Sequence, residues 1–320
     1  MKKLFALLVG LGLAAAVFLA LPWWSEGPAG EDETVIVEPG TSLAGLGTQL
    51  REQGLSDLDA QRWRVLSRLL GGGDPIQAGE FEIPAGASPS RILDIVQHGR
   101  TVQRFVTIPE GMPSILVKER IDALEQLTGE APLAEEGTIL PQTYSYRRGE
   151  SRAALTQRMQ AEMAKTIEEL WPTKTALSVV KTPEEAIILA SIVEKETGKP
   201  EERRDVAAVY SNRLRIGMKL DADPTVIYPV TKGKPLGRRI RRSELDAVND
   251  YNTYRMTGLP AGPIANPGRE SIAAVLDPSQ ISSIYFVADG TGGHIFADTL
   301  EEHNRNVARW YALRRERGEM

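Results

Sequence analysis

Hydrophobic residues gather most densely at the N-terminus of the chain. Two lysines, Lys2 and Lys3, precede an uncharged apolar run over residues 4–21. A run of that length rises about 27 Å as an α-helix, which is close to the thickness of a bilayer core. Positive charge before the run and acidic residues after it favour a cytoplasmic N-terminus. The pattern predicts an uncleaved transmembrane anchor over residues 4–24, with residues 1–3 in the cytoplasm.

Two tryptophans, Trp23 and Trp24, follow the apolar run, and indole rings suit the membrane interface. The alternative for the run is a cleaved signal peptide, which exports the chain as well. Residues 25–33 are polar, carry Gly and Pro, and predict a linker. The expected localisation is therefore the cell inner membrane, with a single pass and the larger part of the chain outside the cytoplasm.

Periodic patterning begins after the linker and predicts a small α+β domain over residues 34–100. Strands are expected at 34–37 and 79–83, with two helices between them, the second over residues 60–70 and ended by three glycines. This order, with Gly-Glu-Phe-Glu-Ile-Pro ending at Pro84, resembles the LysM-type glycan-binding modules. The alternative is a spacer domain that holds the rest of the chain away from the membrane.

One turn recurs along the chain. Residues 37–42, 83–88 and 108–113 each combine an apolar strand end, a proline and a glycine before a helical pattern. Each predicts a turn from a strand into a helix. Either a common way of turning or an internal duplication explains the recurrence.

Residues 101–320 predict a second, larger α+β domain, whose densest signals lie within 182–304. Thr182 can cap a helix, Pro183 fits its first position, and Glu185 completes a capping box. The residues that follow are apolar on nearly every face, which predicts a buried helix.

Glu194 and Glu196 follow this apolar run, and Gly198 is the expected C-cap. Desolvation beside a buried helix raises the pKa of a carboxyl, as a general acid requires. Because each residue turns by about 100°, the two side chains lie roughly 200° apart and cannot enter one site. The helix alone does not choose between them, and it favours two solvated last-turn carboxylates with Lys195 between them.

A second, amphipathic helix is expected over 201–215 and ends at Gly217. Its apolar stripe holds Val206, Val209, Tyr210 and Arg213. Beyond it, Asp223 precedes Pro224, which predicts an N-cap and the first position of another helix.

Composition removes several classes of function. The chain has 320 residues and a formal net charge of −5, which argues against nucleic acid as a partner. Cysteine is absent, so disulfides, thiol catalysis and thiolate metal sites are excluded. The three histidines are scattered, and the sequence predicts no metal site and no cofactor.

Several motifs stand together in the second domain. They are IVEKET at 192–197, NRL at 212–214, DPTVIY at 223–228, YNTY at 251–254, GLPAGPI at 258–264, YFVA at 285–288 and GGHIF at 292–296. In order and spacing they resemble the endolytic murein transglycosylases, the YceG-like or MltG family, from about residue 34 to 303.

The resemblance implies cleavage of the β-1,4 bond between N-acetylmuramic acid and N-acetylglucosamine within glycan strands. Glu194 aligns with the family's catalytic glutamate. It would protonate the leaving oxygen and then take the proton of the muramic 6-hydroxyl, which attacks the anomeric carbon to give a 1,6-anhydro end. Ordinary glycosidases need two carboxylates, whereas an intramolecular nucleophile needs one. The resemblance also implies work near peptidoglycan synthases, where nascent strands end.

Seven further residues are candidates for substrate binding or support: Asn212, Asp223, Thr225, Tyr228, Tyr251, Asn252 and Tyr254. The tyrosines could stack on sugars or pack in the core. Thr225 and Asn252 could bind substrate or form caps and turns. Asn212 could steady Glu194 or face solvent. Asp223 could cap a helix or contact substrate, and Asp221 and Asp223 are the alternatives for a second acid.

The sequence departs from the family in one loop. Where relatives usually carry aromatic residues and an aspartate, residues 136–143 read Glu-Gly-Thr-Ile-Leu-Pro-Gln-Thr. His294, in the turn between strands expected at 284–288 and 295–297, fits a structural role. Two other functions stay open: a hydrolase of the same bond helped by Asp223 or Glu196, and an inactive peptidoglycan-binding scaffold.

Overall fold

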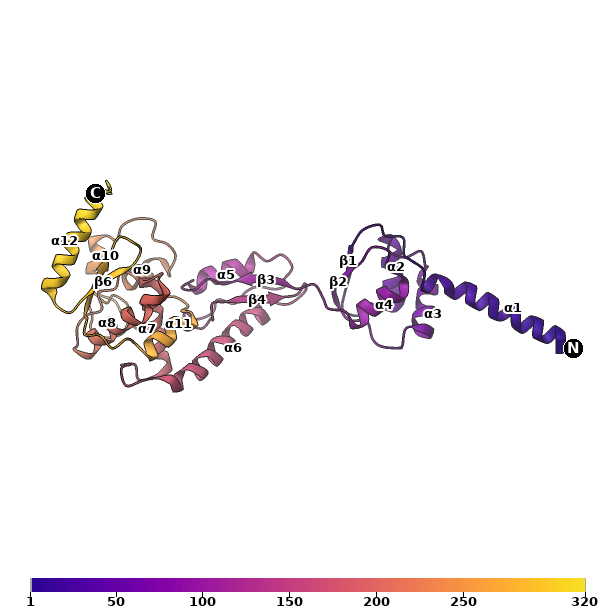
Figure 1. Cartoon of the computed structure of the whole chain (residues 1–320), viewed down its shortest axis with the longest axis horizontal. Helices are drawn as coiled ribbons and strands as arrows, with labels where there is room; N and C mark the ends of the chain where they lie inside the picture. Colours follow the sequence, from indigo (N-terminus) through magenta and orange to yellow (C-terminus); the bar gives the residue numbers. More distant parts are fainter. Residues whose placement is uncertain (1, 320) are drawn as a thin grey trace. The chain divides into compact units, whose positions relative to one another are not determined.

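The computed structural model describes residues 2–319, apart from the side chains of residues 2–6, 8 and 13. Part of the predicted cytoplasmic tail, residues 1–3, therefore lies outside the described residues. The chain forms two compact units, the first comprising Met1–Arg104 with Ser145–Gly149 and the second Phe105–Tyr144 with Glu150–Met320 (Figure 1). The described elements are helices and three two-stranded sheets, so the predicted α+β class is confirmed.

The N-terminal apolar run is helical. Helix α1 covers Lys2–Ala20 and continues into the 3-10 helix η1 at Leu21–Trp23. No helix in the described part of the chain combines the length and apolar character of a membrane span. Trp23 corrects one expectation, because its side chain is 1% exposed and packs against Trp63 with ring centroids 5.4 Å apart. It belongs to a protein core, whereas Trp24 is exposed.

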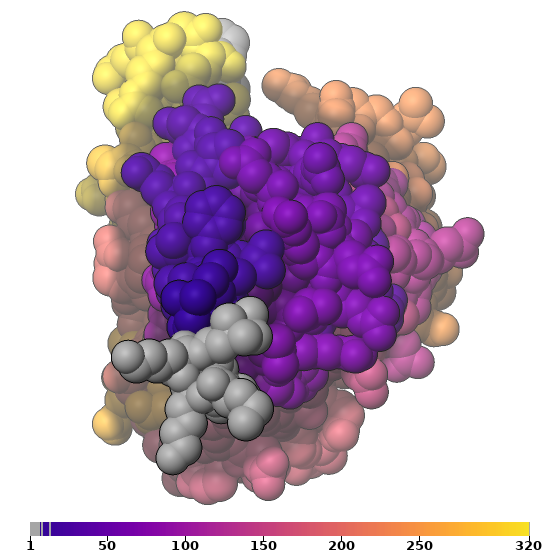
Figure 2. Space-filling model, turned by 90° about the vertical axis from the view of Figure 1, so that its right-hand side faces the viewer, coloured from indigo at the N-terminus to yellow at the C-terminus, as the bar shows by residue number. Residues whose placement is uncertain are grey.

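The first unit contains the predicted strand–helix–helix–strand order. It comprises β1 (Glu33–Val37), α2 (Leu43–Glu52), α3 (Ala60–Leu70), β2 (Gly79–Ile83) and α4 (Pro89–His98). The two strands pair antiparallel, with Val35 opposite Phe81. Both side chains are fully buried in a core that the helices cover. Figure 2 shows the exterior of this unit, in indigo to purple.

Residues 25–33, predicted as a linker, have hydrogen-bond partners in the first unit. The Gly27 amide donates to the Gly86 carbonyl at 3.0 Å, and the Gly86 amide donates to the Ala29 carbonyl at 2.8 Å. Asp32 accepts from the Ala85 amide at 2.9 Å. The segment is bound to the turn after β2, because that turn leaves backbone groups that need partners.

The recurring proline–glycine turn leads from strand to helix at each of its three places. Gly40, Gly86 and Gly111 have φ of 83°, 67° and 69°, the left-handed region that favours glycine. Helices α2 and α4 follow the first two turns, and α5 (Ser114–Asp122) follows the third. The backbone requirement of the turn explains why its residue types recur.

The other elements, in chain order, are β3 (Arg104–Thr107), β4 (Thr143–Tyr146), α6 (Arg152–Leu170), η2 (Trp171–Thr173), α7 (Pro183–Glu196), η3 (Pro200–Glu202), α8 (Arg203–Arg215), α9 (Asp223–Thr231), α10 (Arg242–Asp246), α11 (Arg269–Leu276), β5 (Tyr285–Ala288), β6 (His294–Ala297) and α12 (Leu300–Glu316). Strand β3 pairs with β4, and β5 pairs with β6. Helices α7, α8 and α11 pack on one another and carry most of the second core. In Figure 1 these three helices lie together.

Helix α7 begins as the sequence predicts. The Thr182 hydroxyl accepts from the Glu185 amide at 3.2 Å, and residues 189–193 are fully buried. The end of the helix differs, because extended Thr197 is the C-cap and Gly198 is not left-handed. Helix α8 also starts later than expected, because Pro200 opens the short 3-10 helix first.

Candidate functional site

Glu194 lies at the end of α7 with its side chain 5% exposed. Its Oε2 accepts a hydrogen bond of 2.9 Å from the backbone amide of Gly268, the N-cap of α11. A helix N-terminus presents unpaired amides and a partial positive charge, so this position suits a carboxylate. The end of α7 thus places the Glu194 carboxyl against the N-terminus of α11.

An arginine lies on the other side of this carboxyl. Arg203, the first residue of α8, has Nη2 3.5 Å from Glu194 Oε1. The same Nη2 is closer to Glu110 Oε2, at 2.5 Å. The arginine side chain is 11% exposed and the Glu110 side chain 41%. Glu110 is therefore the solvent-facing partner of a guanidinium that also faces Glu194.

Two glycines allow this close arrangement. A Cβ on Gly268 would lie 2.1 Å from Glu110 Oε1, and a Cβ on Gly111 would lie 3.3 Å from Glu194 Cγ. The Gly111 amide also donates to the Asn266 carbonyl at 2.9 Å. Any side chain at position 268 would displace Glu110.

Glu136, in the atypical loop, is buried in a separate set of contacts. Its Oε1 accepts from the Ser114 amide at 2.9 Å and from Asn266 Nδ2 at 3.2 Å. Burial raises the pKa of Glu136, opposed by hydrogen bonds from Ser114 and Tyr228. Asn266 Oδ1 in turn accepts from the Ile139 amide at 3.0 Å. The loop that lacks the family's aromatic residues is thus held through its glutamate and its backbone.

Tyr228 and Tyr251 lie together, with ring centroids 5.0 Å apart. Both are partly exposed and pack against the core of α7, α8 and α11. Burial raises the pKa of each hydroxyl, with the charge of Glu136 adding to the effect. The pair combines core packing with a surface that a ligand can reach.

Glu196 points to a different place from Glu194, as the helical spacing predicts. The Tyr210 hydroxyl bonds its carboxyl, while Oε1 is buried with no hydrogen-bond partner. Burial raises the pKa of Glu196 to about 7, and the charge of Asp223 adds to the rise. Glu196 bonds Tyr210 whereas Glu194 bonds the Gly268 amide, so the two carboxyls lie in separate surroundings.

The predicted N-cap role of Asp223 is wrong. Ala222 is the N-cap of α9, and Asp223 is the first helical residue. Its Oδ1 accepts from the Tyr254 hydroxyl at 2.7 Å. The preceding Asp221 has φ of 48°, a left-handed conformation that shifts the start of the helix by one residue.

Thr225 and Asn252 are fully buried and support the backbone. The Thr225 hydroxyl lies 2.8 Å from the Thr253 hydroxyl and donates to the Ala222 carbonyl at 2.7 Å. Asn252 Nδ2 donates to the carbonyls of three residues, Glu244, Leu245 and Ala247, and its Oδ1 accepts from the Tyr254 amide at 3.0 Å. Of the two roles open to each, the geometry selects the structural one.

Asn212 does not contact Glu194. Its Nδ2 donates to the carbonyls of Ile281 and Ser283, at 2.9 and 3.0 Å, and its Oδ1 accepts from Arg215. The side chain fixes the segment before β5 to α8. Asn212 therefore neither contacts Glu194 nor points freely into solvent.

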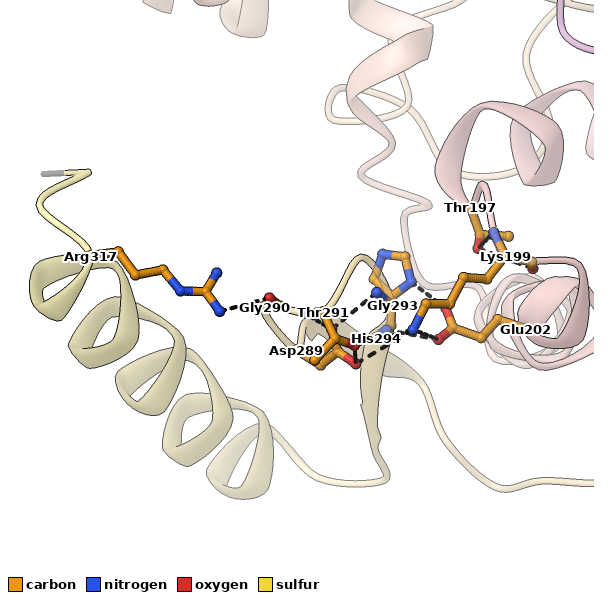
Figure 3. Close-up of polar contacts among 9 residues, drawn as sticks. All are labelled: Thr197, Lys199, Glu202, Asp289, Gly290, Thr291, Gly293, His294 and Arg317. Atoms are coloured by element: carbon orange, nitrogen blue, oxygen red, sulfur yellow. Dashed lines mark hydrogen bonds and ion pairs between the residues drawn. The ribbon is translucent and has the colours of Figure 1, made fainter.

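His294 has the structural role that the sequence indicates. Its Nδ1 lies 2.8 Å from Glu202 Oε2, and its amide donates to Glu202 Oε1 at 3.0 Å. In Figure 3, Lys199 and Glu202 on one side meet Asp289, Thr291 and His294 of the β5–β6 hairpin on the other. The hairpin is thereby held to the turn that leads into α8 and Arg203.

Sequence reasoning missed the residues that surround Glu194: Glu110, Arg203 and Gly268. The one available signal was the charged residue placed between proline and glycine in the turn at 108–113. Among the residues whose placement is described, no group of three or more histidine, aspartate or glutamate side chains could hold a metal ion.

The structure defines an α+β protein whose larger unit holds several shielded carboxyl groups, Glu194 among them. The chain belongs to the YceG-like family, whose model matches residues 35–309.

Relatives and a solved structure agree with this membership. A Streptococcus pneumoniae protein named endolytic murein transglycosylase is 29% identical over 73% of this chain and 50% of its own length. A Bacillus subtilis protein of the same name is 32% identical over 57% of this chain and 49% of its own. The chain thus spans about half the length of these relatives. The crystal structure of a yceG-like protein from Listeria monocytogenes matches with a TM-score of 0.52 and 26% identity, over 87% of this chain and 99% of that one.

Proposed function

We propose that this protein is an endolytic murein transglycosylase with Glu194 as its acid and base. The observation that carries the proposal is the Glu194 carboxyl, almost fully shielded and bound by the Gly268 amide. The names of the relatives supply the substrate class, peptidoglycan. No cofactor enters the proposal.

The reaction needs one proton carrier. The neutral carboxyl of Glu194 protonates the oxygen that leaves C1 of the muramic residue, and the C1–O4 bond breaks. The carboxylate then takes the proton of the muramic 6-hydroxyl while that oxygen bonds to C1. The products are a 1,6-anhydromuramic end and a free 4-hydroxyl, and the proton of the 6-hydroxyl restores the acid. The Gly268 amide holds the carboxyl in place through both steps.

The test compares the full chain with its Glu194→Gln variant. Each is incubated with purified glycan strands, and the released ends are read by mass spectrometry. Anhydromuramic ends from the parent, and a loss of at least about a hundredfold in the variant, are expected because the amide cannot carry the proton. Reducing ends would show a hydrolase instead, and binding without new ends would show a scaffold.

We further propose that the apolar run over residues 4–21 anchors the protein in the inner membrane, with the rest of both units outside the cytoplasm. The apolar run, its two preceding lysines and the single helix over Lys2–Ala20 support this. The expected result is that the full chain sediments with membranes and resists carbonate extraction, whereas a chain lacking residues 4–21 is released. Release of the full chain by carbonate alone would contradict the anchor.

We also propose that the first unit, residues 34–100, is a LysM-like glycan-binding module. The antiparallel pairing of β1 with β2 around two helices supports it. Because the relatives act on murein by name, the two units would meet the same strand, near the synthases that make it. Retention of the Glu194→Gln variant on sacculi, measured by co-sedimentation, tests binding apart from turnover.

A further inference from the structure

Glu194 and Glu110 compete for one guanidinium. Arg203 Nη2 is 2.5 Å from Glu110 Oε2 and 3.5 Å from Glu194 Oε1. The shorter contact is a charge-assisted hydrogen bond, whereas the longer one is an ion pair without a hydrogen bond. Arg203 is therefore committed to the carboxylate that the reaction does not use.

This commitment matters because of what an acid requires. A guanidinium bound closely to Glu194 would favour its charged form, and a charged carboxylate cannot protonate a leaving oxygen. Removing the arginine altogether would leave the carboxyl without a partner on its Oε1 side. The observed geometry lies between these extremes, with the cation near but bound elsewhere.

The surroundings hold Glu110 and Arg203 in these places. Glu110 is carried by the left-handed turn at Gly111 and fills the space where a Cβ at position 268 would lie. Arg203 is fixed at the start of α8, beside Glu202, which binds the hairpin (Figure 3).

Other charged groups near the site have partners of their own. On α7, Lys195 Nζ points to the Gly111 carbonyl at 3.4 Å. Arg204, on α8, binds Asp277, and Arg269, on α11, binds Glu169. Glu270 lines two hollows of about 390 and 350 Å³, one of which reaches Arg203 and the other Glu110. The Glu110–Arg203 pair is the charged contact that directly faces Glu194.

We propose that Glu110 and Arg203 are positioning residues of the reaction: Glu110 binds the guanidinium of Arg203 and so keeps it from closing on Glu194. This inference rests on the proposed function for its consequence in catalysis, but its electrostatic part concerns Glu194 alone. Glu110 has no contact with the scissile bond in this assignment and acts through Arg203.

The test uses the full chain with Glu110→Gln, Arg203→Gln and the double variant. In Glu110→Gln, the Arg203 guanidinium loses the closer of its two carboxylate partners and retains Glu194. The rate of anhydro-end formation should fall about tenfold at neutral pH, with its alkaline limb about one pH unit lower. The double variant removes a negative and a positive charge together, so its profile should return toward that of the parent. Glu169→Gln, which removes a carboxylate from the same hollow without touching Arg203, is the matched control.

A second measurement does not require activity. The carboxyl carbon of Glu194, assigned by its loss in Glu194→Gln, is titrated by NMR in the parent and in Glu110→Gln. A midpoint about one pH unit lower in Glu110→Gln is expected. An unchanged midpoint overturns the proposal, as does a double variant no more active than Glu110→Gln. Absence of anhydro ends from the parent would instead refute the proposed function and leave the titration to decide this inference.

Discussion

The arrangement of side chains around Glu194 depends on Gly268, where Glu110 occupies the space that a Cβ would need. Gly268 adopts an extended conformation with φ of −73°, which alanine tolerates. The constraint is therefore the space taken by Glu110 and not the backbone.

Gly268→Ala should change activity more than stability. The new Cβ displaces the end of a flexible glutamate, so the free energy of unfolding should change by less than about 1 kcal/mol. Because Glu110 then leaves Arg203, the pH profile should resemble that of Glu110→Gln. Gly198→Ala is the control, since nothing lies within 4 Å of a Cβ there. A wild-type profile with lost stability would show that the glycine serves only packing.

Glu196 predicts a pH dependence of stability. Burial raises its pKa to about 7 in the folded chain, above the usual 4.5 of the unfolded one. Between these values the folded state binds the extra proton, so this group makes stability fall as pH rises from 4.5 to 7. Glu196→Gln should remove that fall and stabilise the protein at pH 8 by on the order of 2 kcal/mol.

Urea unfolding at pH 5 and pH 8 measures this effect. Glu201→Gln, at an exposed position in η3, should leave the difference between the two pH values unchanged. If Glu196→Gln keeps the full parental difference, the carboxyl is already ionised in the folded protein at low pH.

At the scale of elements, the β5–β6 hairpin is held to the turn that leads into α8. Glu202 bonds both the ring and the amide of His294, while Asp289 accepts from the Thr291 and Gly293 amides within the turn. The Thr291 hydroxyl, which donates to Asp289 at 2.7 Å, and these two amides lower the pKa of Asp289 to about 2. The turn is therefore preformed where it meets α8.

Glu202→Ala should destabilise the protein more than His294→Ala, because it removes both contacts. In a double-mutant cycle the two changes should show a coupling energy of about 1 kcal/mol, as expected for residues in direct contact. Equilibrium unfolding in urea gives the change in the free energy of unfolding for each single variant and for the double variant, relative to the parent. Simple additivity would mean that the pair contributes nothing to the stability of the hairpin.

The sequence predicted elements better than contacts. The buried face of α7, its capped start at Thr182 and the stripe of α8 all follow from local periodicity and capping. Helices α8 and α9 begin at other residues than the sequence predicts. Pro200 opens a 3-10 helix before α8, and Asp221 is left-handed before α9.

The sequence predicts Glu194 as the acid, which stays a prediction, but it does not predict the residues that surround this side chain. Glu110 precedes it by more than 80 residues and Gly268 follows it by more than 70. Local patterns carry no information on such pairs, since tertiary packing chooses them. The same reason explains why Asn212 and Asn252 were left with two roles: an amide side chain suits a ligand and a turn equally well.

At the scale of the molecule, two units have separate hydrophobic cores. Phe81 is fully buried in the first and Leu189 in the second. Separate cores of this kind commonly unfold in separate steps.

Calorimetry of the full chain should therefore resolve two transitions. Phe81→Ala should cost about 3–5 kcal/mol and lower only one of them, and Leu189→Ala should cost about 2–5 kcal/mol and lower the other. Anhydro-end formation should survive the first change and not the second. A single transition moved by both variants would mean that the two units unfold together.

The turn that carries Glu110 has a consequence for adaptation. Its shape is set by a proline before and a left-handed glycine after, and the same shape occurs at Gly86 with an alanine in the middle position. That middle residue is thus exchangeable without refolding the chain. A single codon change in this turn can in this way alter the charge beside Arg203 and Glu194 without disturbing the helix that bears Glu194.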